Sequence, residues 1–116
     1  MEEAILAWQK AVQYSNRLPQ HLGALGYGYG KSGQTDKAHK ILEELELKSR
    51  NGYVSAMDIS KVYAGLGDTD RAFAILEETY TSREPWIFGL KLDPGFDTIR
   101  DDPRFLNLLS RIGVEP

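Results

Sequence analysis

The sequence predicts an all-α protein, built as a solenoid of antiparallel helix pairs. When it is shifted by 34 positions, GQTDKAHKILEE (33–44) aligns with GDTDRAFAILEE (67–78). A period of this length indicates stacked supersecondary units. Apolar residues recur at intervals of three and four, as they do on amphipathic helices. No segment has the pattern of a strand.

Composition limits the classes of protein that need consideration. The chain has 116 residues, a net charge of −3 and no cysteine, which excludes disulfides and cysteine zinc sites. An acidic chain with interspersed charges lacks the basic face of a nucleic-acid binder. The N-terminus is acidic and amphipathic, unlike a signal peptide, and no apolar run is long enough for a membrane span. We therefore expect a cytoplasmic domain with no nucleic acid or membrane partner.

The first predicted helix lies within residues 1–16 and has no first-helix partner. EEAILAWQKAV (2–12) matches the second helix of a repeat unit, with Ala4, Trp8 and Ala11 in the places of Ala38, Leu42 and Leu45. This match predicts that the chain starts in the middle of a repeat. We expect a fragment of a longer protein, and the alternative is a natural start with an unpaired helix.

Residues 19–52 form the first complete unit. Leu22, Leu25 and Tyr29 share one helical face, and Gly33 marks the turn before the next helix. The second helix of the unit places four apolar residues inward: Ala38, Ile41, Leu42 and Leu45.

Residues 53–86 repeat this plan. Ser55, with Asp58 three residues later, predicts a capping box at the start of the unit's first helix. Gly67 ends that helix, and Thr69 or Asp70 is the expected N-cap of the next.

Residues 87–116 form the predicted C-terminal cap. A short helical run at 86–92 precedes two Asp-Pro steps, Asp93-Pro94 and Asp102-Pro103, which suit helix starts. The last helix spans about 103–112 and ends at Gly113. It should close the open end of the solenoid.

The unit resembles the tetratricopeptide repeat (TPR) family. The first unit matches the family pattern at Leu25, Gly26, Tyr29, Gly33, Ala38 and Leu42. The second matches at Ile59, Ser60, Tyr63, Gly67, Ala72 and Leu76. The resemblance implies a single domain over 1–116, a right-handed superhelical solenoid. The usual Trp is absent, since Leu22 and Ala56 stand in its place.

Residues 50–114 also resemble the C-terminal TPR tails of bacterial multidomain signalling and regulatory proteins. The similarity runs through YVSAMDISKVYAGLGDTDRAFAILEETY, the EPW step and LKLDPGFDTIRDDPRFLNLL. In those proteins the tail follows a cyclase, a kinase or a DNA-binding module. No catalytic residue of such modules is present here.

The stretch GYGYGKSG (26–33) has two features of nucleotide-binding loops. A Walker loop ending at Gly30-Lys31-Ser32 needs a glycine at position 25, but that position holds a leucine, Leu25. The dinucleotide fingerprint needs a preceding strand, and none is predicted. We therefore expect no nucleotide and no other cofactor.

Three glycines exceed what the repeat pattern requires. Gly26 allows helices to approach and Gly33 makes the turn, whereas Gly23, Gly28 and Gly30 have no assigned role. Together these three cost the helix roughly 2–3 kcal/mol relative to alanine.

The family places the first helix of each unit on the concave face, which we call the inner face. Its predicted partner-binding residues are Gln20, Gly23, Tyr27, Gly30 and Lys31, followed by Val54, Met57, Lys61, Ala64 and Gly65. We predict a shallow groove from which Tyr27 stands up, flanked by Lys31 and Lys61, that suits a peptide with acidic character. The competing interpretation is that Tyr27 is half-buried against a neighbouring helix and the extra glycines have no purpose.

Other side chains form no recognisable catalytic or metal site. His21 and His39 lie on different helices without ligand-like neighbours, and Asp102 is better explained as an N-cap than as half of a pair with Asp101. Trp8 and Trp86 are expected to be packing residues. The chain is therefore predicted not to be an enzyme and to hold no metal.

The leading functional hypothesis is a protein–protein interaction module, a scaffold within a larger bacterial protein. One alternative is homo-oligomerisation through the first helix, by way of the apolar residues Ile5, Leu6, Trp8 and Val12. Another alternative is a small-molecule or nucleotide sensor that uses the glycine-rich helix.

Overall fold

A computed structural model describes residues 2–52, 54–82 and 89–113 of the chain. All secondary structure in these ranges is helical, as predicted. The elements in chain order are α1 (Glu2–Tyr14), α2 (Pro19–Lys31), α3 (Thr35–Asn51), α4 (Ala56–Leu66), α5 (Thr69–Thr81), the 3-10 helix η2 (Pro94–Ile99) and α6 (Pro103–Ile112). The helical run expected at 86–92 lies partly outside the described residues.

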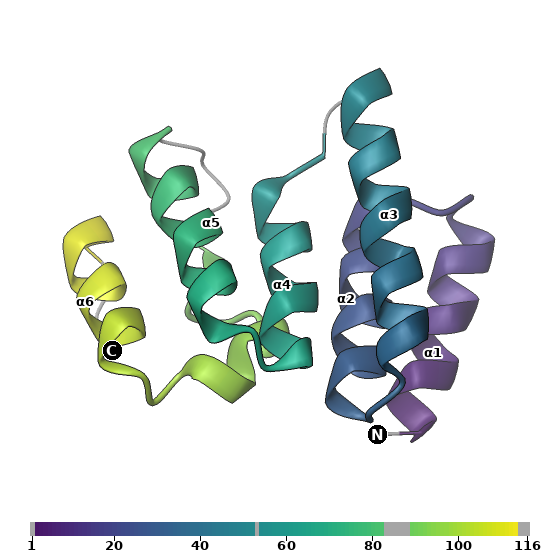
Figure 1. Cartoon of the computed structure of the whole chain (residues 1–116), viewed down its shortest axis with the longest axis horizontal. Coiled ribbons are helices and arrows are strands. Elements are labelled where there is room, and N and C mark those ends of the chain that lie inside the picture. The colour runs from purple at the N-terminus through teal and green to yellow at the C-terminus, as the bar shows by residue number, and fades with distance from the viewer. Residues whose placement is uncertain (1, 53, 83–88, 114–116) are drawn as a thin grey trace.

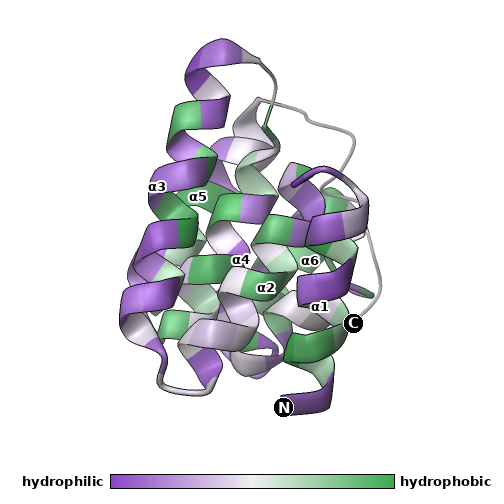
Figure 2. Ribbon diagram, turned by 90° about the vertical axis from the view of Figure 1, so that its right-hand side faces the viewer, coloured by the Kyte–Doolittle hydropathy of each residue, from purple (hydrophilic) through white to green (hydrophobic). Residues whose placement is uncertain are grey.

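The helices stand side by side in a row along the long axis of the molecule (Figure 1). From α1 to α5 they run alternately up and down, whereas α6 runs parallel to α5. Tight turns join α2 to α3 and α4 to α5, so each pair forms an antiparallel hairpin. Viewed along this row, α3 and α5 lie on one side and α2 and α4 in the middle (Figure 2). The end of the row nearest the N-terminus is formed by α1, which packs on α2.

The two hairpins end their first helices in the same way, 34 residues apart. Gly33 and Gly67 both have φ of +83°, a left-handed conformation that favours glycine. In each unit the next amide reaches back to a tyrosine carbonyl: Gln34 N to Tyr29 O at 2.8 Å, and Asp68 N to Tyr63 O at 3.0 Å. The sequence repeat is therefore a repeat of local structure, with a glycine cap that satisfies the last carbonyls of each helix.

The predicted helix starts are confirmed in part. Ser55 Oγ accepts from Met57 N, and Asp102 accepts from Arg104 N at 2.8 Å, so both residues are N-caps. The expected capping box of Ser55 with Asp58 is not formed, because the Asp58 carboxylate faces Lys61 at 3.6 Å and does not bond back to Ser55. The N-cap of α5 is Asp68, which accepts from Arg71 N at 3.3 Å. The prediction of Thr69 or Asp70 there is wrong, because α5 begins at Thr69, directly after the glycine cap, so that Asp68 occupies the capping position.

Three glycines allow the backbones of α2 and α4 to touch. A Cβ on Gly65 would lie 2.4 Å from the Tyr27 carbonyl oxygen, and one on Gly30 would lie 2.7 Å from the Gly65 carbonyl carbon. At the other end of the contact, a Cβ on Gly23 would lie 2.9 Å from the Asp58 carbonyl oxygen. Real Cβ atoms do not approach backbone this closely, so these positions require glycine.

The remaining interior glycines of α2 receive side chains. A Cβ on Gly26 would lie 2.6 Å from Val62 Cγ2, and one on Gly28 would lie 2.7 Å from the ring of Trp8. Gly28 is thus the recess into which the α1 tryptophan packs, and the same ring meets Tyr27 edge-on at 6.2 Å between centroids. Every interior glycine of α2 therefore has a neighbour that occupies the space a side chain would need.

The C-terminal part packs against the second hairpin. Leu90, Phe96 and Ile99 join α4 and α5 residues in one buried cluster, together with Phe105 and Leu108 of α6. On the surface, α6 binds α5 through two ion pairs, Arg104 with Asp70 at 2.9 Å and Arg111 with Glu77. The last helix spans the predicted residues and ends at Gly113, whose φ is +83°.

Replacing Gly65 by alanine should destabilise the protein. Alanine gains about 1 kcal/mol of helix propensity, but its Cβ must displace the α2 backbone, and overpacking of this kind costs roughly 1–3 kcal/mol. We expect a net loss of stability in denaturant unfolding. Gly52→Ala is the matched control, because a Cβ there meets no atom closer than 4.0 Å. A Gly65→Ala protein as stable as wild type would contradict the packing described here.

Candidate functional site

Most of the predicted inner face lies inside the protein. Buried positions comprise Gly23, Tyr27, Met57, Ala64 and Gly65. Partly buried positions comprise Gly30, Val54 and Lys61, whereas Gln20 and Lys31 are exposed. The exposed fraction of Tyr27 is 3%, so the expectation that it stands up from a groove is wrong. The close contact between α2 and α4 leaves no room for such a groove.

The C-terminal segment covers the α4 part of this face. Lys61 Nζ lies 2.6 Å from an Asp93 carboxylate oxygen, and Thr98 Oγ1 donates to the Ala64 carbonyl at 3.1 Å. Phe96 between them is fully buried. The acidic residue expected to meet Lys61 from a partner is thus supplied by the chain's own Asp93.

Displacing this segment would be costly. Leu90, Phe96 and Ile99 are all buried, and fully burying each such side chain contributes about 1.5–3 kcal/mol. Removing all three would cost roughly 5–9 kcal/mol, comparable to the whole stability of a small domain. This face is therefore part of the core and not a free binding surface.

Beneath this segment lies a small buried charge network. Asp58 is 3.6 Å from Lys61, which also binds Asp93. Burial raises the pKa of Asp58, whereas the neighbouring Lys61 and, more weakly, His21 oppose that rise. The network ties η2 to α4, and the second carboxylate keeps the partly buried lysine paired.

The predicted oligomer face is also largely internal. Ile5 and Val12 are core residues packed with α2 and α3, and Trp8 packs into the Gly28 recess. Only Leu6 is well exposed, at 57%. These four residues therefore do not form an exposed oligomer face, because α2 covers the side of α1 that bears Ile5, Trp8 and Val12.

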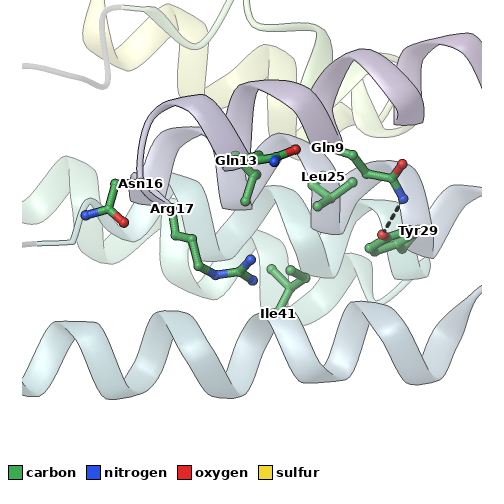
Figure 3. Close-up of a pocket in the computed structure, with 8 residues that line it drawn as sticks. Gln9, Gln13, Asn16, Arg17, Leu25, Tyr29 and Ile41 are labelled. Atoms are coloured by element: carbon green, nitrogen blue, oxygen red, sulfur yellow. Dashed lines mark hydrogen bonds between the residues drawn. The ribbon is translucent and has the colours of Figure 1, made fainter.

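An open groove lies on the opposite side of α2, between α1 and α3 (Figure 3). Its volume is about 480 Å³. The lining consists of Gln9, Val12, Gln13, Asn16 and Arg17 from α1 and the following turn, Leu25 and Tyr29 from α2, and Ile41 from α3. The apolar and aromatic residues, which come from α1, α2 and α3, form the floor of the groove. The polar residues lie along the α1 side.

The polar side of the groove is a row of amides. Gln9 Nε2 donates to the Tyr29 hydroxyl at 2.9 Å, which fixes both side chains (Figure 3). Gln13 and Asn16 are exposed, and their amide groups bond to no other group in the described part of the chain. Each offers one acceptor and two donors to a molecule in the groove.

The end of the groove is closed by an unusual turn. Asn16 and Arg17 have φ of 58° and 62°, the only non-glycine residues with positive φ within 2–52, 54–82 and 89–113. Asparagine tolerates this conformation, but arginine there costs roughly 1–2 kcal/mol. The backbone bond from Arg17 N to Val12 O, at 2.8 Å, holds the turn.

A two-point ion pair fixes the Arg17 side chain across the groove. Its Nε and Nη2 donate to the two carboxylate oxygens of Glu44 on α3, each at 2.6 Å. Hydrogen bonding to Arg17 lowers the pKa of Glu44, against a smaller opposing effect of burial. Strained backbone that is held by specific contacts is typical of functional sites.

The described residues, those of the groove included, hold no candidate metal site. In the described ranges no cluster of three or more histidine or carboxylate side chains could hold a metal ion. Nor does any described helix combine the length and hydropathy that a membrane span requires. Comparisons of the chain with models of protein families, with curated proteins and with solved structures give no match.

Sequence reasoning missed this groove for a definite reason. Gln9, Gln13 and Asn16 read as ordinary solvent-facing positions, because nothing local reveals that α3 stands opposite them. One signal was present in SNRLP (15–19), the segment between α1 and α2. This turn contains no glycine, so asparagine is its best candidate for a left-handed conformation.

Replacing Glu44 by glutamine should destabilise the protein in a pH-dependent way. Arg17 depresses the pKa of Glu44 in the folded state below its ordinary value of 4.5. The pair therefore stabilises the fold above pH 4.5, and this contribution is lost as pH falls through the lower folded-state pKa. In urea unfolding at pH 7, the free energy of unfolding of the wild type should exceed that of Glu44→Gln by about 0.2–1 kcal/mol. The difference should vanish at a pH below the folded-state pKa of Glu44.

The double-mutant cycle supplies the control for this prediction. In an Arg17→Gln background, the Glu44→Gln substitution should change the free energy of unfolding little, both at pH 7 and at acid pH. A pH-independent difference, or one that persists without Arg17, would show that the ion pair is not its source.

Proposed function

We propose that this chain is a non-catalytic protein-interaction module that binds a peptide segment in the groove between α1 and α3. The observation that supports the proposal most is the groove itself, an open channel with an apolar floor and a row of amides along one side. Its volume of about 480 Å³ is within the range of ligand sites. It is open along its length, which suits a chain segment better than an enclosed small molecule.

The chemistry of the lining favours an extended peptide. Leu25, Ile41 and Val12 are each at most 5% exposed, so they offer a small apolar surface against which aliphatic side chains can lie. Gln13 and Asn16 can bond to the peptide backbone. An extended segment exposes unpaired N–H and C=O groups, and these amides can satisfy both kinds.

The repeat resemblance agrees with this proposal. The matching glycine caps at Gly33 and Gly67, with the two hairpins side by side, support a short TPR-like solenoid. Arrays of helix pairs create extended binding surfaces, although here the candidate surface lies between α1 and α3 and not on the expected inner face. As a scaffold, the module would belong to a larger bacterial regulatory protein.

Replacing Gln13 by tryptophan should block peptide binding. Dodecapeptides would be selected from a random phage library on the full chain, then synthesised and measured by fluorescence anisotropy. Gln13→Trp places a large ring in the groove, and we expect it to weaken the selected peptides at least tenfold without lowering the melting temperature.

Gln20→Trp is the matched control for this substitution. Gln20 is also an exposed glutamine in a helix, but it lies on the predicted inner face and outside the groove. Binding that is lost in Gln20→Trp and kept in Gln13→Trp would place the site on the inner face. Failure to select any peptide whose binding Gln13→Trp reduces would overturn the proposal.

A further inference from the structure

One end of the groove has positive charge and unused hydrogen-bond donors. Arg17 has five N–H donors, of which two bind Glu44, leaving three without a partner in the described part of the chain. Its side chain is 51% exposed despite the ion pair. The guanidinium is therefore held in one orientation while much of it still faces solvent.

The charges at this end do not cancel. Lys48 lies one helical turn beyond Glu44 on α3, on the same helix face. Arg17 and Lys48 against Glu44 leave a local charge of +1, whereas the whole chain has −3. Positive charge at the closed end of an otherwise neutral, amide-lined groove is complementary to an acceptor that carries negative charge.

We propose that the partner segment carries a carboxylate that binds Arg17 and, two positions away, an aliphatic residue that packs on Ile41. This inference rests on the proposed function, because it specifies the ligand of the same groove. The Glu44 ion pair prepares the guanidinium for this role: it removes the rotamer freedom that a free arginine would lose on binding. It also gives a role to the arginine whose backbone is strained at the end of the groove.

The geometry of α3 sets the spacing within the partner. Ile41 and Glu44 are three residues apart, which corresponds to about 4.5 Å along the helix axis. An extended peptide advances about 3.3 Å per residue and repeats its side-chain direction every second residue. Side chains that face the same way on an extended peptide are about 6.6 Å apart, which is the same-face spacing nearest to the roughly 4.5 Å on α3. The aliphatic side chain and the carboxylate are therefore expected two positions apart, as in Leu-x-Asp or Val-x-Glu.

The inference is tested with the tightest dodecapeptide selected on the full chain and with its Asp→Asn or Glu→Gln analogue. We expect the selected peptides to contain an acidic residue two positions from an aliphatic one. Neutralising it should weaken binding to wild type about tenfold. Arg17→Gln should cause the same loss, and the two changes together should cost no more than either alone.

Arg50→Gln is the control, because it removes the same charge two residues beyond Lys48, on a different side of α3. It should leave peptide affinity within twofold. Melting temperatures of both variants check the fold, and 1 mM acetate tests whether a free carboxylate competes.

The outcomes separate this inference from the proposed function. Peptides that Gln13→Trp blocks, but that lack an acid or bind Arg17→Gln as tightly as wild type, overturn the carboxylate site and leave the interaction module standing. Selection of no groove-binding peptide overturns both. Additive losses from the two changes would show that the carboxylate binds somewhere other than Arg17.

Discussion

The architecture depends on the backbone contact between α2 and α4. Gly30 and Gly65 lie against each other's helices so closely that neither has room for a Cβ, and Gly23 does the same against Asp58. Helices normally pack 8–10 Å apart because side chains separate them. Removing those side chains brings the two hairpins together and buries the polar backbone and Tyr27 between them.

This contact has an energetic cost that the surrounding packing must offset. Four glycines in the interior of α2 cost roughly 3–4 kcal/mol of helix propensity. Each is matched by a neighbour: α4 backbone at Gly23 and Gly30, Val62 at Gly26 and Trp8 at Gly28. The gain in dispersion contacts and buried apolar area compensates for the propensity lost. Because these neighbours come from different sides, α2 is the helix on which both α1 and α4 depend.

The same arrangement determines which surfaces are free. Since α4 and the Asp93–Ile99 segment fill one side of α2, the inner face is internal, and the Lys61–Asp93 ion pair completes its coverage. On the other side, α1 and α3 stand apart over Leu25 and Tyr29, with Arg17 and Glu44 bridging them at one end. The groove is therefore a consequence of how the glycine-rich helix positions its neighbours.

Local patterns in the sequence were sufficient for the helices and their ends. Gly33, Gly67 and Gly113 marked three helix ends, and Asp102 marked a start. The reason for Gly23, Gly28 and Gly30 could not be predicted, because it depends on residues distant in sequence. The repeat register also assigned Tyr27 and Met57 to a free face, since it does not reveal that Trp8 and the α4 backbone enclose Tyr27, or that Met57 packs with the chain's own C-terminal residues. The groove escaped prediction for the same reason, because its two walls are brought together only by packing.

The backbone contact can be observed directly by NMR. In the full chain with selectively labelled glycine, the Hα protons of Gly65 should give strong nuclear Overhauser effects to the Hα of Tyr27, because the two backbones touch at these residues. Absence of such cross-peaks, together with effects only between side chains of α2 and α4, would contradict the account, because it would mean that ordinary side-chain packing separates the two helices.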